Sequence, residues 1–514
     1  MKYKIIFATL LLIGLASLLL PGCNNKKTQS PPLQAANPAL EISGKQLSIK
    51  YCSGCHLYPE PALLDKKSWK NVLPVMKAQM NKSNVSPKLF EWLVIEDFYM
   101  RQAPAALTAT PSETLTEATT QFRQTNSFTA ILPKESSATL VKYDKESSQL
   151  FVGDAAGNLY VIRKNRLVRS IHTNNIPVDI QTDRINNNLL VLGIGNFFPS
   201  EEKKGNLVAI DTAGNQHIIA DSLKRPVQFI NQDFDADGKS EYLIASFGSV
   251  LGKINSGKLS LFFLHDGKYQ KKVIKESPGA TKTVVGDFNH DGKPDFMALF
   301  AQGRESISMF LNKGNLTFVE EPLLEFPPVY GSNSFDLADI NGDSYPDIIF
   351  TNGDNSDYST IYKGYHGVRI FINNGQNKFQ EKYFFPINGA SRVVTRDFDT
   401  DGDLDLAVLA MFPDLTRRAQ ETLVYLQNEG NLHFNPSYLE KEPSAKWFLM
   451  DAGDIDQDGD EDLIVGANTM VSLPIPDHYQ QRWKRKKISY TIFQNITPPK
   501  TQAPGFWQKF LNMF

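Results

Sequence analysis

Three cysteines occur in the 514 residues, and two of them lie in one short motif. Cys52-Ser53-Gly54-Cys55-His56 has the spacing of a c-type haem attachment site. On a helix, residues three and four positions apart share one face, so both thiols could bond to the porphyrin while His56 binds the iron. The pattern therefore predicts a covalently held haem c attached through Cys52, Cys55 and His56.

Two other chemistries also use closely spaced cysteines: a thiol redox pair and half of a zinc site. A zinc site needs further Cys or His at ligand spacing, and a thioredoxin-like pair needs a βαβ context. No other Cys follows, and the next His is His172. The sequence therefore favours haem over both alternatives.

The residues around the motif, 43–102, resemble a compact cytochrome c domain. The pattern predicts helices over 43–51, 69–80 and 87–101. We expect the aromatic and aliphatic residues of the third helix to form its core.

The second axial ligand of the iron should be Met or His. Because no His follows nearby, methionine is favoured. Met76 is the first choice, since its spacing from Trp69 resembles that in other small cytochromes; Met80 and Met100 are the alternatives.

The amino terminus has the character of an export signal. Lys2 and Lys4 precede an apolar run over 5–20 that ends at Leu20-Pro21-Gly22-Cys23. This ending resembles the lipobox of bacterial lipoproteins, which implies that 1–22 is removed, that Cys23 carries lipid and that 23–42 is a flexible tether. The alternative is an uncleaved membrane anchor. Either interpretation implies a membrane-anchored protein of the bacterial cell envelope, facing the periplasm or the cell surface.

Five acidic loops recur along the rest of the chain. They begin at Asp233, Asp287, Asp339, Asp397 and Asp454, between 52 and 58 residues apart. Each places oxygen-bearing side chains at positions 1, 3, 5 and 9 within nine residues. The candidate ligands are Asp233, Asp235, Asp237 and Glu241; Asp287, Asn289, Asp291 and Asp295; Asp339, Asn341, Asp343 and Asp347; Asp397, Asp399, Asp401 and Asp405; and Asp454, Asp456, Asp458 and Asp462.

This spacing predicts that the loops bind up to five Ca²⁺ ions. Crowded carboxylates repel one another unless a cation neutralises them, and oxygen ligands around a glycine turn suit a hard cation. An ordinary Asp/Gly turn is the alternative for a single loop, but not for the whole set. The third loop carries Ser344 in place of the glycine, which puts its geometry in question.

Each acidic loop leads into a β-rich apolar run, a second strand, a Gly/Asn turn and a further strand. Four strands in a period of this length are typical of a propeller blade. Two earlier periods, 138–164 and 177–211, carry strands without the acidic loop. The fold class is therefore mainly β: a seven-bladed β-propeller preceded by a small all-α cytochrome c domain.

On these loops and strands, residues 122–497 resemble FG-GAP/VCBS-repeat proteins, the integrin-alpha-like propellers with Ca²⁺ loops between strands of a blade. The first two blades depart from that pattern. The resemblance implies adhesion or ligand binding as functions, so it does not by itself decide among them.

The propeller needs a strand to close its ring, because the last blade runs into Thr497-Pro498-Pro499 after three strands. Residues 128–134 form a β-type run before the first blade. We predict that this run supplies the missing outer strand and so removes two open edges. Residues 103–121 are then a linker, and 498–514 are a Pro-rich segment with an aromatic tail.

Long connections lie on the rim opposite the acidic loops and contain aromatic residues, among them Tyr365, Phe412 and Tyr479. They form a binding surface for a sugar, a partner or a haem edge, or they fold inward to fill the loops.

Composition narrows the function further. The chain is 41% hydrophobic and 21% charged, which excludes a collagen, a coiled coil and a disordered protein. Lys and Arg (54) nearly balance Asp and Glu (56), so no basic field favours nucleic acid. No serine-hydrolase, zinc-protease, Walker A or dinucleotide-binding motif is present.

The leading hypothesis is an envelope-anchored electron-transfer protein, an electron carrier rather than a catalytic enzyme, whose propeller recognises a redox partner protein or a small-molecule substrate. One alternative is an oxidoreductase whose propeller passes substrate electrons to the haem. The other is an adhesion lipoprotein that binds a glycan or protein ligand and carries an accessory haem.

Overall fold

The computed structural model describes residues 38–107, 115–125, 137–198, 200–248, 256–355, 359, 361–470 and 475–496. The predicted signal peptide, Cys23 and the aromatic tail lie outside these ranges. Within them, every helix is too short or too polar to span a bilayer.

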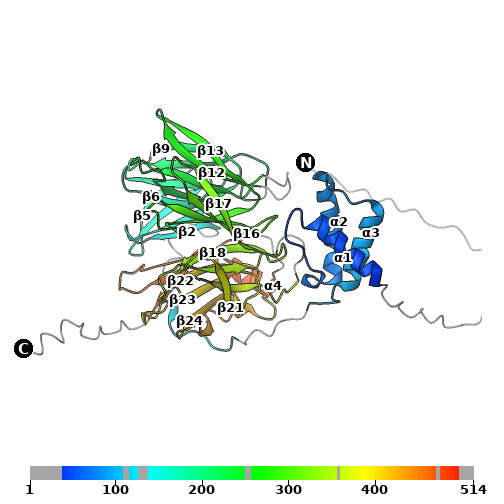
Figure 1. Ribbon diagram of the computed structural model, residues 1–514. Helices are drawn as coiled ribbons and strands as arrows, with labels where there is room; N and C mark the ends of the chain where they lie inside the picture. Colours follow the sequence, from blue (N-terminus) through cyan, green and yellow to red (C-terminus); the bar gives the residue numbers. More distant parts are fainter. Residues whose placement is uncertain are drawn as a thin grey trace, which may run out of the picture.

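Two lobes form the molecule, a small helical one and a large β one that touch along one side (Figure 1). The helical lobe contains α1 (Pro38–Cys52), α2 (Lys66–Lys82) and α3 (Leu89–Gln102), with a short 3₁₀ turn at Pro61–Leu63. Its core gathers Trp69, Trp92, Phe98 and Tyr99 with leucines and valines. All three predicted helices are present, although α1 starts at Pro38, inside the predicted tether, because proline is well tolerated in a first helical turn.

The β lobe is a ring of seven four-stranded antiparallel sheets, which confirms the predicted seven-bladed propeller. Blades 1 to 3 comprise β2 (Ala138–Asp144), β3 (Gln149–Asp154), β4 (Asn158–Arg163) and β5 (Arg166–His172); β6 (Pro177–Asp183), β7 (Asn188–Gly193), β8 (Gly205–Ile210) and β9 (Gln216–Leu223); and β10 (Pro226–Gln232), β11 (Glu241–Ser246), β12 (Lys258–His265) and β13 (Lys268–Glu276).

Blades 4 to 6 repeat the same order. They comprise β14 (Ala280–Gly286), β15 (Asp295–Phe300), β16 (Ser306–Asn312) and β17 (Phe318–Glu325); β18 (Ser332–Ala338), β19 (Asp347–Asn352), β20 (Gly367–Asn373) and β21 (Phe379–Pro386); and β22 (Ala390–Arg396), β23 (Asp405–Ala410), β24 (Leu423–Asn428) and β25 (Phe434–Tyr438).

Blade 7 contains β26 (Trp447–Gly453), β27 (Asp462–Ala467), β28 (Tyr490–Asn495) and, as its outer strand, β1 (Phe122–Thr125). A helix, α4 (Asp477–Lys486), fills the connection between β27 and β28. The innermost strands β2 and β26 contact each other and complete the circle.

The apolar runs that follow the acidic loops in the sequence form the second strands of their blades. In blades 3 to 7 all six residues of this strand are buried, because neighbouring blades cover both of its faces. A strand buried on both faces has a continuous apolar sequence rather than an alternating one.

An N-terminal strand closes the ring, as predicted, but it is not the predicted segment. Phe122–Thr125 pairs antiparallel with β28, whereas residues 128–134 lie outside the described ranges. Phe122 is buried and meets Phe398 and Tyr425 edge to face, with ring centroids 5.4 and 5.3 Å away. This aromatic anchor favours the earlier position, since it inserts into the interface between blades 6 and 7.

The end of the predicted linker also belongs to the propeller. Leu115 is buried in the core between blades 5 and 6. The Thr119 N–H donates to the Tyr438 carbonyl, and the Tyr438 N–H donates to the Glu117 carbonyl. Residues 115–121 therefore lie along the outer edge of β25, where they satisfy backbone groups that would otherwise form an open edge.

Truncation of the closing anchor should destabilise the whole propeller. Phe122→Ala removes a buried aromatic ring from a packed interface and is expected to cost about 3 to 5 kcal/mol of unfolding free energy. Arg123→Ala, at the exposed neighbouring position, is the matched control and should change little. Equal denaturation midpoints for the two variants would show that β1 does not hold the ring closed.

Candidate functional site

Each acidic loop connects the first and second strands of blades 3 to 7, so all five lie on one rim. Four share a turn in which the position 1 carboxylate accepts the position 6 N–H at 2.8 to 3.0 Å. Position 6 has positive φ throughout, including Ser344 at 71°. The third loop therefore keeps the same turn geometry as the others, although its position 6 is Ser344 and not glycine.

The carboxylate at position 9 begins the second strand and is at most 3% exposed in all five loops. It accepts the N–H of position 2 at 2.8 to 3.2 Å, which folds the loop back over the strand. Burial, with repulsion from neighbouring loop carboxylates, raises the pKa of Glu241 and of Asp462 to about 7 and that of Asp347 to about 6. Bringing a cation into such a loop would stabilise the ionised form.

Several loops bring carboxylate oxygens close enough to share one ion. In three of them, three carboxylates each place an oxygen within 4.8 Å of the others: Asp233, Asp235 and Glu241; Asp397, Asp399 and Asp405; and Asp454, Asp456 and Asp458. The second and third loops carry Asn289 and Asn341 at position 3, and amide oxygens also suit Ca²⁺.

Two of these oxygens, Asp233 Oδ1 and Asp456 Oδ1, are buried without a hydrogen-bond partner. A buried carboxylate oxygen without a donor is costly, and a bound cation would satisfy it. The residues of the loops therefore fit a hard cation.

Sequence reasoning missed the asparagines that support four of the loops. The N–H groups of Asn312, Asn373, Asn428 and Asn495 donate to the second oxygen of the position 9 carboxylate at 2.7 to 2.9 Å. The amides of Asn312 and Asn495 also reach the preceding blade, at the carbonyls of Phe234 and Phe398. The sequence does contain a signal for these asparagines, because the third strand of each of these blades ends in Asn.

The glycines at position 6 test the turn independently of metal. At Gly402, φ is 103° and an added Cβ would meet nothing within 4 Å, so a substitution there reports backbone strain alone. Gly402→Ala is expected to cost about 1 kcal/mol of unfolding free energy. Ser344→Gly, the reverse exchange, should stabilise by up to about 1 kcal/mol. If both variants and the wild type unfolded at the same denaturant concentration without metal, this turn geometry would be contradicted.

The haem-type motif lies at the end of α1 rather than on it. Cys52 is the last helical residue, and residues 53–55 form a turn, with the Ser53 N–H donating to the Ile49 carbonyl at 3.2 Å. The expectation that all three ligands share a helical face was wrong in this respect; a glycine at position 54 favours leaving the helix. Cys52 is buried and Cys55 is exposed.

The His56 ring is held in one orientation. Its Nδ1 lies 2.8 Å from the Leu57 carbonyl, so Nδ1 carries the proton and Nε2 is free to bind a metal. Burial lowers the pKa of His56, and the Arg304 charge adds to this effect. The ring is therefore neutral at pH 7, as an iron ligand requires.

The two cysteines do not have the character of a thiol redox pair. Burial raises the pKa of Cys52 to about 11. Exchange reactions need a thiolate, and this thiol is protonated at neutral pH. The surroundings of Cys52 are apolar and include the aromatic rings of Trp69 and Tyr99, and the buried Tyr58 hydroxyl has no partner.

The three candidate methionines all belong to the helical lobe. Met80 is buried in its core, while Met76 and Met100 are partly buried and pack against the cluster that contains Cys52. Met76 lies one turn before Met80 on α2. The choice of Met76 as the axial ligand stays a prediction.

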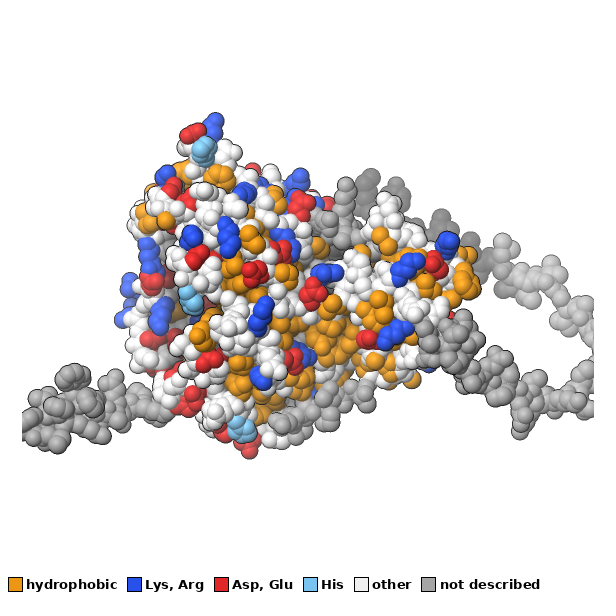
Figure 2. Space-filling view, in the orientation of Figure 1, with side chains coloured by type: hydrophobic (Ala, Val, Ile, Leu, Met, Phe, Trp, Pro, Cys, Tyr) orange, Lys and Arg blue, Asp and Glu red, His pale blue; other side chains and the backbone are white. Residues whose placement is uncertain are grey.

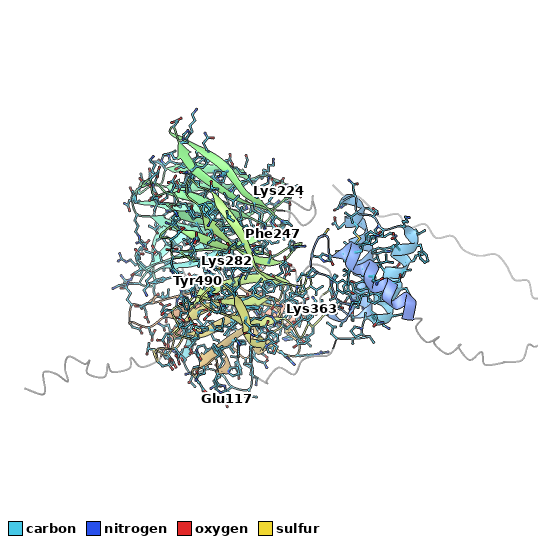
Figure 3. The ribbon with its side chains drawn as sticks, viewed as in Figure 1. Glu117, Lys224, Phe247, Lys282, Lys363 and Tyr490 are labelled. Carbon is cyan, nitrogen blue, oxygen red and sulfur yellow. The ribbon has the colours of Figure 1, made fainter. Side chains whose placement is uncertain are left out.

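The helical lobe docks on the rim opposite the acidic loops. The Tyr365 hydroxyl donates to the Leu63 carbonyl at 2.9 Å, and the Ser68 and Ser359 hydroxyls are 2.9 Å apart. Lys363, labelled in Figure 3 next to the helices, is buried beneath this contact and donates to the Ser359 carbonyl. Figure 2 shows the two lobes in direct contact.

The aromatic residues of this rim mostly point inward. Phe412 and Tyr479 are 7% and 2% exposed, and Tyr365 is engaged by the helical lobe. Their burial favours the interpretation that they fill the long connections over an exposed aromatic binding face.

Residues 233–298 and 287–350 match the FG-GAP-like repeat family. The chain is 29% identical over 207 residues to integrin alpha-V of Gallus gallus, covering 36% of this chain and 19% of that one. It is 27% identical over 143 residues to a T-cell immunomodulatory protein homolog of Plasmodium falciparum, covering 24% and 18%. The match to FG-GAP-like repeats thus covers residues 233–350, and the chain spans less than a fifth of the length of these curated relatives.

Two solved structures are similar to this chain at lower sequence identity. The Cps50 (Swd1) β-propeller domain of Myceliophteria thermophila has a TM-score of 0.44 at 10% identity, covering 73% of this chain and 99% of that one. The N-terminal domain of Nup159 has a TM-score of 0.41 at 12% identity, covering 75% and 99%. The number of blades rests on the strand pairing of this chain itself.

Proposed function

We propose that this protein is an envelope-anchored electron carrier in which a c-type haem domain is mounted on a calcium-binding propeller. Cys52 and Cys55 would hold the haem and His56 would bind its iron, with Met76 as the opposite ligand. The haem would supply one-electron transfer at a potential raised by methionine ligation. Lipid on Cys23 would tether the protein to a bacterial membrane.

The observation that carries this proposal is the state of His56 beside Cys52. The Leu57 carbonyl fixes the tautomer and leaves Nε2 available, while the neighbouring thiol is buried and protonated. A structural zinc site would need further Cys or His ligands, and a redox pair would need a low thiol pKa. Haem attachment would need only the two thiols and the neutral His56 ring.

The placement of the helical lobe supports a role for the propeller as platform and recognition surface. The lobe contacts blade 5 and the connection that leads into it through Val329, Ile361 and Ser359, and it leaves the acidic rim uncovered. A redox partner protein or a small substrate could therefore approach either the helical lobe or the remaining propeller surface. Nothing in the charge balance favours nucleic acid.

Anaerobic spectroscopy of protein matured in a host that attaches c-type haem tests the proposal. We expect a c-type Soret band that persists after denaturation and shifts on reduction by other cytochromes. Reduction by an added sugar or other small substrate would favour the oxidoreductase alternative instead. No Soret band after competent maturation would overturn both redox functions.

Partial similarity to integrin alpha-V favours a second candidate, adhesion through the propeller. In that case a glycan or protein ligand would bind equally well to the wild type and to Cys55→Ala, and the haem would be accessory. Binding that changes with the redox state of the haem would contradict this candidate.

A further inference from the structure

The innermost strand of every blade carries the same irregularity. In all seven blades the pairing with the second strand shifts between the first and third residues, for example between Ala280 and Lys282 and between Ala390 and Arg392. Such bulges turn a side chain away from its regular direction. The third residue of each strand therefore lines the central channel.

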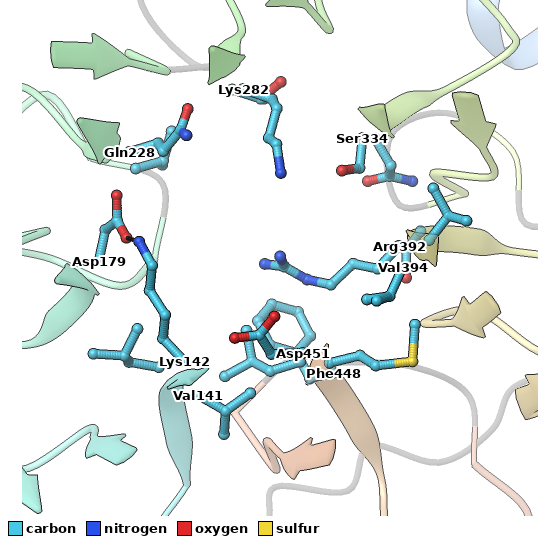
Figure 4. Close-up of a pocket in the computed structure, with 18 of the residues that line it drawn as sticks. Val141, Lys142, Asp179, Gln228, Lys282, Ser334, Arg392, Val394, Phe448 and Asp451 are labelled. Carbon is cyan, nitrogen blue, oxygen red and sulfur yellow. Dashed lines mark hydrogen bonds and ion pairs between the residues drawn. The ribbon is translucent and has the colours of Figure 1, made fainter. Parts of the chain in front are cut away.

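This ring of equivalent positions is chemically asymmetric. Leucines occupy it in blades 1 and 7, and blades 2 to 6 carry Asp179, Gln228, Lys282, Ser334 and Arg392. The channel encloses a cavity of about 400 Å³, which is within the range of small-molecule sites. Figure 4 shows the Lys282 ammonium and the Arg392 guanidinium directed into the same space from different blades.

The carboxylates of the channel already have donors. Asp179 receives Lys142 at 2.8 Å together with the N–H groups of Ile180 and Phe229. Asp451 accepts the Tyr143 N–H at 2.7 Å, and Asp336 accepts the Leu337 N–H at 3.1 Å. The fourth cation, Arg396, pairs with Glu461.

The side chains of Lys282 and Arg392, in contrast, form no hydrogen bond or ion pair with any described residue, although the charges of Asp336 and Asp451 act on them from a greater distance. Each therefore directs unmatched N–H donors at the cavity. Enclosure by the blades lowers the pKa of Lys282; the charge of Asp336 opposes this shift, and the positive charge of Arg392 adds to it. A negatively charged oxygen between the two groups would satisfy both.

One wall of the cavity is apolar and includes Val141, Phe448 and Leu449. Figure 4 places Val141 and Phe448 on the side away from Lys282. A ligand with an anionic end and a small apolar body matches both parts of the lining.

We propose that the central channel binds a small organic anion, a carboxylate or a phosphate ester, with its oxygens between Lys282 and Arg392 and its apolar part against Phe448. This site is separate from the acidic loops and from the haem motif, and it does not depend on either. Lys282 supplies a point charge, and Arg392 supplies the planar pair of donors that suits a carboxylate or phosphate.

Calorimetric titration of the full mature protein with benzoate and with inorganic phosphate, at ionic strength matched with chloride, tests the proposal. We expect saturable binding of benzoate, with affinity at least tenfold lower in Lys282→Gln and in Arg392→Gln. Lys268→Gln, an exposed lysine on β13, is the matched control and should bind as the wild type does. No saturable binding of either probe, or binding by both channel variants with the affinity of the wild type, would overturn the site.

A second measurement needs no substitution. Arginine-specific modification of the wild type by phenylglyoxal, followed by peptide mapping, should show Arg392 protected by benzoate and exposed Arg163 unaffected. Equal modification of Arg392 with and without benzoate would contradict the proposal even if a channel variant failed to fold.

Discussion

Removal of calcium is expected to lower the melting temperature of the propeller by about 10 to 20 °C. A cation present at a hundred times its dissociation constant stabilises the folded state by about 2.7 kcal/mol per site. Loss of four or five such ions would therefore remove on the order of 10 kcal/mol, spread over a domain of more than 350 residues. Calorimetry with and without EDTA, together with metal analysis of the purified protein, measures this effect.

The buried carboxylates determine how the stability of the propeller, with and without calcium, depends on pH. In metal-free protein, burial raises the pKa of Glu241, Asp405 and Asp462 to about 7, above the ordinary values of Asp and Glu. The folded state then binds more protons than the unfolded state between about pH 4 and 7, so the metal-free protein becomes less stable as the pH rises through this window. Because protons compete with calcium, the stabilisation by calcium should be larger at pH 8 than at pH 5.5.

A variant pair within one loop separates metal binding from simple charge removal. Asp405→Asn removes a candidate ligand, whereas Asp403→Asn removes an exposed charge at position 7, where a Ca²⁺ loop uses the backbone carbonyl. Only Asp405→Asn should reduce the shift produced by EDTA. A transition that EDTA does not move, in protein without bound calcium, would contradict the proposed metal sites.

Replacement of both Cys52 and Cys55 by alanine is expected to abolish covalent haem completely. Each thiol supplies one thioether bond, so either single variant should retain a weaker attachment and the double variant none. Mass spectrometry of denatured protein, with the absorption spectrum of the native form, measures the loss.

Ser53→Ala, in the same turn, is the control and should keep its haem. The folded state of each variant can be checked through the propeller, whose unfolding transition should not change. If the wild type itself carried two unmodified thiols after competent maturation, the haem proposal would fail while the propeller and its loops would remain.

Local patterns in the sequence were sufficient for much of this structure. The acidic loops, the buried second strands and the three N-terminal helices each follow from periodicity or spacing within a few residues. Ser344 shows the limit of such reasoning, because its N–H donates to the Asp339 carboxylate as in the other loops and the turn is kept without a glycine at this position. Haem and calcium remain predictions from residue type; three of the acidic loops bring carboxylate oxygens together as a calcium site requires.

Nonlocal features were harder to predict. The closing strand was placed at 128–134, although Phe122–Thr125 pairs with β28, because no local pattern distinguishes two short β-type runs that compete for one distant edge. The sequence of a single strand does not indicate its bulge. The ring of channel-lining positions that contains Lys282 and Arg392 is therefore recognised only from the strand pairing of all seven blades.

The pairing of β1 with β28 also sets the order of events during biosynthesis. Thr125 and Ile492, joined by a hydrogen bond, are 367 residues apart in the chain. At the usual speed of a ribosome, about 5 to 20 residues per second, the first partner waits on the order of 20 to 70 s for the second to be made. Throughout that delay β1 has no partner and the ring of blades stays open, so assistance from a holding chaperone would matter until the last blade is made.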